Sequence, residues 1–489
     1  MLIAPVLGVL MTLSFAPFDL AWLSFIALPG LFLVADRGSV KHAAWSGFLF
    51  GLGWFGSGVS WVFVSIYDHG GEQLWMALAA TLLFVLLWSI FPALSMGLAR
   101  WLKARLPASI LLLPAAWLAV EAIRGMWFLQ GFPWLLAGYS QIDTPLAGFA
   151  PVLGVYGLTF VLALLANSLA WMSQYPQHRP VLACLLLIVA GLSLAGTQWT
   201  WTRSQGSLMV SVAQGNIAQR DKWQPQHRNA TLDRYVSLTE AHWQPLVVWP
   251  EAAIPAFYHE VSPGFLDYLD ELAQAKQATV LTGLPVKRED GRRFNAALAV
   301  GQSQGWYFKK HLLPFGEYLP WADTLEPWVA RLNLPLGHFS AGDAQQPLLS
   351  VAGQRLILSI CYEDVFPATA RELNDARFLV NITNDAWFGR SIELAQHGQI
   401  ARMRALESER YLVRAANTGL TAIINHKGRL QTSAPLFTAT IISGQIDLRS
   451  GLTPFSRVGD AGIVTGLLTL CVLQLLISAW RARNSSVSL

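Results

Sequence analysis

Three short segments place a reactive or ionisable side chain where an apolar, β-rich run gives way to polar residues. The first segment ends on Glu251, and the third brings Cys361 to an abrupt change from apolar to acidic residues. The second carries Lys309 and Glu317 on either side of an apolar, turn-forming core. A carboxylate can act as a general base, and a thiol held at a strand end can attack with the following backbone N–H groups aligned beside it. These residue types suit nucleophilic catalysis.

Taken singly, each segment is also consistent with a structural role. Glu251 fits a solvated loop carboxylate, and the stretch from Tyr307 to Glu317 fits an amphipathic loop with surface charges. Cys361 fits a buried, inert cysteine. It is the lone cysteine of the polar region, because Cys184 and Cys471 lie within apolar stretches, so no disulfide can form inside that region. Only the combination of the three segments favours chemistry.

The composition predicts a membrane protein. Hydrophobic residues make up 53% of the 489-residue chain and charged residues only 13%, against about 25% charged in soluble domains. The 21 tryptophans agree with this, because tryptophan is enriched at membrane interfaces. The net charge of +4 comes largely from Lys and Arg beside apolar segments. We interpret it as a topology signal, and we expect no nucleic-acid partner.

About eight transmembrane helices are expected, because crossing a bilayer takes roughly 17–25 apolar residues. We expect the first of these segments to be retained as a helix and not cleaved as a signal peptide. The candidate spans are residues 3–18, 20–35, 43–66, 74–100, 107–122, 146–172, 180–197 and 460–480.

Basic residues in the loops predict the orientation of these spans. Arg37, Arg100 and Lys103 follow the second and fourth spans, whereas the opposite loops carry Asp68 and Glu72. Both termini are then cytoplasmic. The region between the seventh and eighth spans lies on the far side, which is the periplasm if the protein sits in the inner membrane of a Gram-negative bacterium.

The region between the last two spans predicts an α/β domain, because short β-rich runs alternate with helical stretches. The expected domains are residues 1–200 with seven helices, 201–458 with the catalytic residues, and 459–489 with the eighth helix and a short tail. The expected strands are Leu208–Val212, Pro245–Trp249, Thr279–Leu284, Arg355–Ile360 and Phe378–Ile382, and the expected helices are 228–242, 263–276 and 393–415.

The order and strand-end context of Glu251, Lys309 and Cys361 resemble the nitrilase superfamily, whose members use a Glu–Lys–Cys triad. On a multi-helix membrane carrier, this combination resembles the apolipoprotein N-acyltransferase family. The resemblance implies an αββα sandwich for the catalytic domain. Further matching segments, in both halves of the chain, are Val212-Ala213-Gln214-Gly215-Asn216-Ile217, Lys222-Trp223, Thr383-Asn384-Asp385-Ala386-Trp387-Phe388-Gly389, Glu121, Arg124 and Gly131-Phe132-Pro133-Trp134.

The resemblance implies two acyl transfers through a thioester. A phospholipid, with phosphatidylethanolamine expected, donates its sn-1 acyl chain to Cys361. The α-amine of a diacylglyceryl-cysteine apolipoprotein then takes the chain. Glu251 would be the general base, and Lys309 would stabilise the oxyanion, since the family pattern Tyr-x-Lys-x-His-Leu falls on Lys309 and not on Lys310.

Further residues match functional positions of the family. Glu317 resembles a supporting carboxylate, and Tyr362 and Glu363 adjoin the nucleophile. Trp223 and Trp387 are candidates for lining the acyl path, although packing within a loop explains Trp387 equally well. The pair Glu121 and Arg124 at the edge of an apolar run fits either a structural ion pair or a headgroup contact.

Two other functions remain open on sequence grounds. In a membrane-anchored amidase of the nitrilase type, water would resolve the thioester. A transporter or scaffold with a non-catalytic domain is disfavoured, because all three triad positions are filled and the spans hold few ionisable groups. We expect no metal site, because the histidines do not cluster at ligand spacing. We also expect no soluble cofactor.

Overall fold

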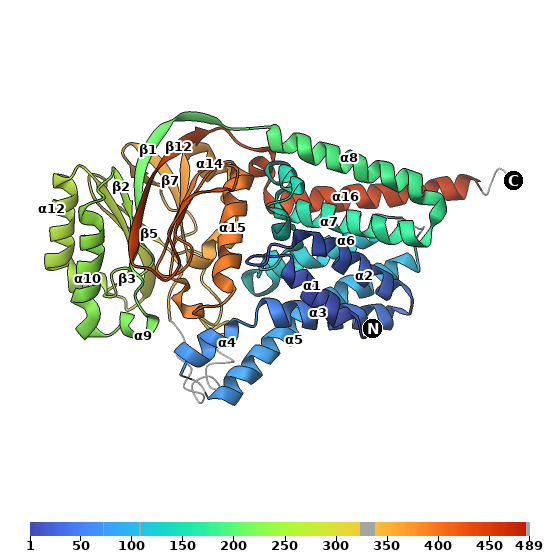
Figure 1. The fold of residues 1–489 in the computed structure, drawn as a ribbon, viewed down its shortest axis with the longest axis horizontal. Coiled ribbons are helices and arrows are strands. Elements are labelled where there is room, and N and C mark those ends of the chain that lie inside the picture. The colour runs from blue at the N-terminus through green and yellow to red at the C-terminus, as the bar shows by residue number, and fades with distance from the viewer. Residues whose placement is uncertain (72, 107–108, 323–337, 486–489) are drawn as a thin grey trace. The chain divides into compact units, whose positions relative to one another are not determined.

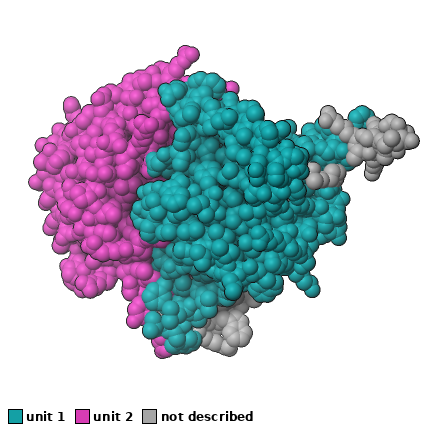
Figure 2. Space-filling view, turned by 45° about the vertical axis from the view of Figure 1, so that its right-hand side comes forward, with its two compact units in different colours: residues 1–63, 74–199, 458–489 teal, residues 64–73, 200–457 magenta. Residues whose placement is uncertain are grey.

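A computed structural model describes residues 1–71, 73–106, 109–322 and 338–485, with the side chains of 481–485 left aside. The chain forms two compact units, coloured separately in Figure 2. Unit 1 comprises Met1–Phe63, Leu74–Trp199 and the residues from Val458 onward, and unit 2 comprises Val64–Gln73 and Thr200–Arg457.

Unit 1 is built mainly of helices. Its helices are α1 (Ala4–Leu13), α2 (Ser24–Asp36), α3 (Val40–Gly58), α5 (Leu74–Lys103), α6 (Leu112–Ala122), α7 (Ala150–Gln174), α8 (Arg179–Gln198) and most of α16 (Pro454–Ser485), with the short α4 (Val62–Val64) after α3.

The structure confirms a multi-pass membrane half, but it does not confirm eight spans. Among the described residues, five helical segments are long and apolar enough to cross a bilayer, or six if Val40–Gly58 and the bent continuation Val62–His69 count as one. Ala4–Leu13 is too short, because its 10 residues extend only about 15 Å of the roughly 30 Å apolar thickness. Residues 107 and 108 of the predicted span 107–122 lie outside the described residues. The five segments are Leu74–Lys103, Leu112–Gln130, Pro145–Gln174, Pro176–Gln198 and Pro454–Trp480.

Small residues allow the first helices of unit 1 to pack backbone against backbone. A Cβ added to Gly8 of α1 would lie 2.1 Å from the carbonyl oxygen of Phe50 in α3, and one added to Gly47 would lie 2.2 Å from that of Pro92 in α5. Lipid supplies no hydrophobic force between helices, so such close van der Waals contact is what holds membrane helices together.

A buried ion pair holds the segment that follows α6. The Arg124 guanidinium bonds both carboxylate oxygens of Glu121, and one of its nitrogens also donates to the carbonyl oxygens of Phe132 and Trp134, each at 2.7 Å. Neither charged side chain is more than 1% exposed. The structure therefore favours the structural reading of this pair, which pins the Gly131–Trp134 motif to α6.

Unit 2 contains two six-stranded sheets, each with a parallel centre. The first, in spatial order, is β12 (Thr440–Ser450), β1 (Arg203–Gln214), β2 (Leu246–Val248), β3 (Thr279–Lys287), β4 (Arg293–Gly301) and β5 (Gly305–Phe308). The second is β11 (Leu430–Ser433), β10 (Ala422–Ile424), β9 (Leu412–Ala416), β8 (Phe378–Thr383), β7 (Gln354–Ile360) and β6 (Leu349–Val351).

Alternation along the strands builds the layers, because successive side chains of a strand point to opposite faces. Leu246 and Val248 of β2 join the core between the two sheets, whereas Val247 packs with α10 (Pro225–Glu240) and α12 (Asp267–Ala275). On the second sheet, Leu379 and Leu412 pack with α14 (Ala370–Asp375) and α15 (Glu393–Ser408). Figure 1 shows the resulting helix–sheet–sheet–helix layers, which confirm the predicted αββα sandwich.

One predicted helix, 393–415, was wrong at its end. Helix α15 stops at Ser408, Glu409 takes a left-handed φ of 46°, and Leu412–Ala416 forms the central strand β9. The apolar spacing of Ile400, Met403 and Leu406 does mark buried positions of the helix. The prediction extended the helix through Leu412 because a short apolar run does not by itself distinguish a buried strand from a buried helix.

Replacing Glu121 with Gln should destabilise unit 1, because the buried Arg124 guanidinium would lose its counter-ion. Breaking one side of a buried pair typically costs about 3–5 kcal/mol. Thermal unfolding of the detergent-solubilised protein measures the loss. The matched control is Asp36→Asn, which breaks the partly exposed pair with Lys103. Equal losses in the two variants would contradict the assigned role.

Candidate active site

Cys361 occupies a sharp turn at the carboxyl end of β7. The strand ends at Ile360, and a short 3-10 helix, Cys361–Val365, begins at once. Cys361 has a φ of 53°, a left-handed conformation that side chains other than glycine rarely adopt. Such backbone strain is concentrated at active sites, and here it sets the sulfur at the strand edge with N–H groups following it.

Glu251 follows β2 in the other sheet and is nearly buried, with 8% of its surface exposed. Its Oε1 accepts a 2.6 Å hydrogen bond from the amide of Asn295, which also donates to Glu317 at 3.0 Å. Asn295 belongs to β4 and interrupts a run of buried apolar residues. One side-chain amide therefore bridges the two carboxylates that the sequence singled out.

Lys309 completes this group directly after β5. Its ammonium nitrogen lies 2.8 Å from Oε2 of Glu317, and its side chain is 1% exposed. Its backbone N–H donates to the carbonyl of Asn295, so β4 positions the lysine as well as the carboxylates. The next residue, Lys310, pairs instead with Glu372 at 3.1 Å.

The charges of the site act on one another. Burial, with the Glu251 charge, raises the pKa of Cys361 well above its ordinary value, and Lys309 opposes that rise. Burial also raises the pKa of Glu251. For Lys309, burial disfavours the charge, but Glu317, Cys361 and Glu251 outweigh it and raise the pKa. At rest the site holds a protonated thiol, a carboxyl group of enhanced basicity and a permanent ammonium.

Glu363 links the loop that begins at Lys309 (the lysine loop) to the turn Cys361–Val365, which carries the proposed nucleophile (the nucleophile turn). Its buried carboxylate accepts hydrogen bonds from the backbone N–H of Ile360, which precedes the nucleophile, and from those of Lys310 and His311. The hydroxyl of Tyr307 in β5 donates to the same carboxylate. Burial raises the pKa of Glu363. A single side chain thus joins the ends of β5 and β7.

The remaining predicted residues lie around this centre. Tyr362 is buried, and its ring meets that of Phe366 edge-on. Trp223 and Trp387 are 48% and 41% exposed. Trp387 meets the ring of His69 edge-on, with centroids 5.7 Å apart. The two tryptophans are available at the surface of unit 2, while Tyr362 is part of its interior.

A buried network of charged side chains, which the sequence analysis missed, contacts the nucleophile turn. The two ring nitrogens of His397 in α15 lie 2.9 Å from Asp364 and 3.0 Å from Asp385. Arg414 in β9 pairs with the same two aspartates. Asp364 is within the turn that starts at Cys361, so the network ties that turn to α15 and β9.

This network includes a group that could hold a metal ion by distance alone, namely Asp385, Glu393 and His397. Burial and Arg414 oppose a charge on His397, but Asp364 and Asp385 outweigh them and raise its pKa to about 10. A protonated ring has no lone pair to offer a metal. The cluster therefore fits a proton better than a metal, and the expected lack of a metal site stays a prediction.

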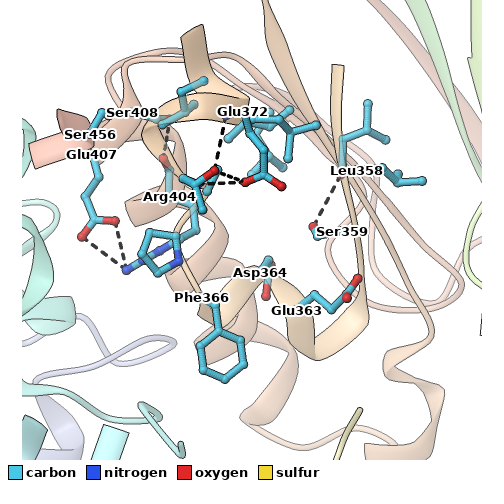
Figure 3. A pocket seen from close by; sticks show the side chains of 18 of the residues that line it. Leu358, Ser359, Glu363, Asp364, Phe366, Glu372, Arg404, Glu407, Ser408 and Ser456 are labelled. Carbon is cyan, nitrogen blue, oxygen red and sulfur yellow. Dashed lines mark hydrogen bonds and ion pairs between the residues drawn. The ribbon is translucent and has the colours of Figure 1, made fainter. Parts of the chain in front are cut away.

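A cavity of about 150 Å³ is lined by residues of β7, β8, α14 and α15. Figure 3 shows Glu363 and Asp364 on one side of it and the paired Arg404 and Glu407 on the other. Cys361 is not among the described residues that line the cavity. The cavity does meet the turn that begins at Cys361, through Glu363 and Asp364.

Two further residues escaped the sequence analysis as members of the site. Asn295 carried one signal, a polar side chain inside an apolar strand, but a lone Asn there is common. Lys222 was noted only as part of a matching motif, and the structure places its ammonium 3.1 Å from the backbone carbonyl oxygen of Glu251.

His397 should stabilise unit 2 in a pH-dependent way. Its ordinary pKa is about 6.5, and its folded pKa is raised to about 10. A raised pKa means that the contribution is complete below about pH 6.5 and is lost as the pH rises through about 10. The difference in unfolding midpoint between wild type and His397→Gln should shrink across that interval. The exposed His227→Gln should show no such trend, and a constant difference would contradict the buried cation.

Comparisons with known proteins found two matching families and similar solved structures. The family described as "Apolipoprotein N-acyltransferase N-terminal domain" matches residues 7–169, and "Carbon-nitrogen hydrolase" matches residues 209–451. A carbon-nitrogen hydrolase structure from Helicobacter pylori G27 is 18% identical, with a TM-score of 0.38, over 50% of this chain and 89% of that one.

Curated relatives match over almost the whole chain. A Methylococcus capsulatus protein named apolipoprotein N-acyltransferase is 42% identical over 99% of this chain and 97% of its own length. One of the same name from Vibrio vulnificus is 38% identical over the same shares. Identity at this level over both units, together with the two family matches, places the chain in the apolipoprotein N-acyltransferase family.

Proposed function

We propose that this chain moves an acyl chain from a phospholipid, through a thioester on Cys361, to the N-terminal α-amine of a diacylglyceryl-cysteine apolipoprotein. One observation carries the proposal: the charges of Glu251 and Lys309 both act on the half-buried thiol of Cys361, in a chain whose described residues include five or six segments long and apolar enough to cross a membrane. The relatives named apolipoprotein N-acyltransferase support it.

In the first step, the sulfur of Cys361 attacks the carbonyl carbon of the donor ester, and Glu251 accepts the thiol proton. The carbon–sulfur bond forms while the carbonyl oxygen becomes an oxyanion, which the Lys309 ammonium stabilises. When the oxyanion collapses, the ester carbon–oxygen bond breaks. The leaving lysophospholipid takes the proton back from Glu251.

In the second step, the acceptor amine attacks the thioester carbon, and Glu251 accepts the amine proton. The carbon–nitrogen bond forms, the carbon–sulfur bond breaks, and the proton returns to the sulfur of Cys361. A carboxyl group whose pKa is raised by burial suits this cycle, because it accepts a proton more readily and still releases it.

The supporting residues have positioning roles in this scheme. Glu317 orients Lys309 through the 2.8 Å ion pair. Glu363 holds the lysine loop against the nucleophile turn, and Tyr362 packs that turn from within. Trp223 and Trp387 line the path of the acyl chain with exposed indoles.

The membrane half gives the lipid substrates an apolar path. Exposing an acyl chain to water costs about 0.8 kcal/mol per CH2 group, so a catalytic domain at the bilayer surface avoids most of that cost. We propose domains at 1–200, 201–458 and 459–489, with the middle one in the periplasm of a Gram-negative bacterium and the others in its inner membrane. Phosphatidylethanolamine is the proposed donor.

Intact mass measurement tests the thioester. Incubation with phosphatidylethanolamine in detergent micelles should add one acyl group to the wild type and none to Cys361→Ala, whereas Cys184→Ala, in the apolar α8, should still be acylated. A diacylglyceryl-cysteine peptide should remove the adduct and gain the acyl group on its amine. Release by water at the same rate without the peptide would favour the amidase alternative, and an adduct on Cys361→Ala would refute the nucleophile.

Lys309→Met should slow adduct formation, because it removes a charged donor to the oxyanion. Loss of one such donor typically costs roughly 100–1000-fold in rate. Single-turnover mass measurements give the rate. Lys310→Met, which loses the partly exposed pair with Glu372 and the contact with the Tyr307 ring, is the matched control. Similar slowing in both variants would contradict the role assigned to Lys309.

A further inference from the structure

Lys222 is a buried cation that the mechanism above does not use. It ends the short helix α9 (Gln219–Lys222), and its side chain is 1% exposed. Its ammonium donates to the backbone carbonyl of Glu251 at 3.1 Å, the one hydrogen bond found for it among the described residues. Burying an ammonium costs several kcal/mol unless an opposite charge and hydrogen-bond acceptors offset the loss of water.

Without Lys222, the negative charges near Glu251 outnumber the positive charges. Glu251 and Glu317 share the amide of Asn295, so two carboxylates lie on one side-chain amide. Lys309 is paired closely with Glu317, at 2.8 Å, and must also serve Glu251 and the oxyanion. Two carboxylates against one ammonium leave a net charge of –1 in a buried site. The Lys222 ammonium offsets this charge.

The same contact holds the backbone of Glu251. Ala252, the next residue, has a φ of 47°, so the chain turns sharply just after the base. On one side β3 approaches closely, since a Cβ on Gly283 would lie 2.7 Å from Cα of Glu251. The ammonium of Lys222 bonds the carbonyl of the same peptide.

We infer that Lys222 is a positioning residue for the general base. Its ammonium anchors the backbone of Glu251 and keeps the carboxylate of Glu251 charged, so that Glu251 can accept a proton from Cys361. This rests on the proposed function, in which Glu251 is the base. Burial lowers the pKa of Lys222 to about 8, and the charge of Glu251 opposes that fall. Lys222 is therefore still charged at neutral pH.

The test is the pH profile of adduct formation on Cys361, measured by mass with phosphatidylethanolamine in micelles. The acidic limb of this profile follows ionisation of Glu251. The Lys222 ammonium lowers the pKa of the Glu251 carboxyl group, so Lys222→Met should move the limb to higher pH. The rate should be lost mainly at low pH and recover toward alkaline pH.

Two more variants separate the effect of the Lys222 charge from that of its hydrogen bond to the Glu251 carbonyl. Lys222→Arg keeps a cation and should keep the limb close to that of the wild type. Lys222→Gln keeps a hydrogen-bond donor without the charge and should show the upward shift. Lys222→Gln also decides the question if Lys222→Met fails to fold. Arg220→Met, two residues earlier on the same helix and 83% exposed, removes an equal charge from the surface and should leave the profile unchanged.

The outcomes distinguish this inference from the proposed function. If the wild type forms no adduct, the proposed function itself fails. If the wild type forms the adduct but Lys222→Met and Lys222→Gln lose rate equally at every pH, the role of Lys222 is structural alone and the inference is overturned. An unchanged profile in Lys222→Gln overturns it as well.

Discussion

The site depends on placing one ammonium ion among acids and a thiol where water is largely excluded. Lys309 is 1% exposed and 2.8 Å from Glu317, and its charge also acts on Glu251 and Cys361. Charges in such surroundings interact far more strongly than in water. The same burial that makes the thiol hard to ionise makes the carboxyl group a better base and the ammonium a better oxyanion donor. Small displacements of these groups would change all three effects together.

The sandwich supplies the rigidity that this arrangement needs. Glu251 follows the end of β2 in one sheet, Lys309 follows the end of β5 in the same sheet, and Cys361 follows the end of β7 in the other. The core between the sheets fixes their distance. Glu363 then joins two of the strand ends directly, and the network of Asp364, His397, Asp385 and Arg414 anchors the strained turn of Cys361 to helix α15 and strand β9. Polar groups buried this completely are stabilising only when they are fully paired.

The helical unit follows a different packing rule. Its helices meet through small residues, as at Gly8 and Gly47, and its buried ion pair serves to hold a non-helical segment. In apolar surroundings the backbone carbonyls of such a segment need donors, and Arg124 supplies them. Hydrogen bonding within unit 1 therefore accounts for the position of the Gly131–Trp134 segment.

The residue pattern alone was enough to predict the membrane half, an α/β domain and the three strand-end segments, because apolar periodicity and abrupt changes of polarity are local properties of a chain. The αββα sandwich came from the family resemblance. The residue pattern misplaced the end of helix 393–415, since a short apolar run is consistent with helix or strand until its neighbours are known. The count of eight spans is not confirmed, since residues 3–18 include a helix of only ten residues. Only the tertiary structure decided which polar residues serve the site. Asn295 reaches Glu251 across 44 positions, and Lys222 reaches it across 29. Such contacts are set by which strands pair and how the sheets stack, so no pattern of neighbouring residues contains them.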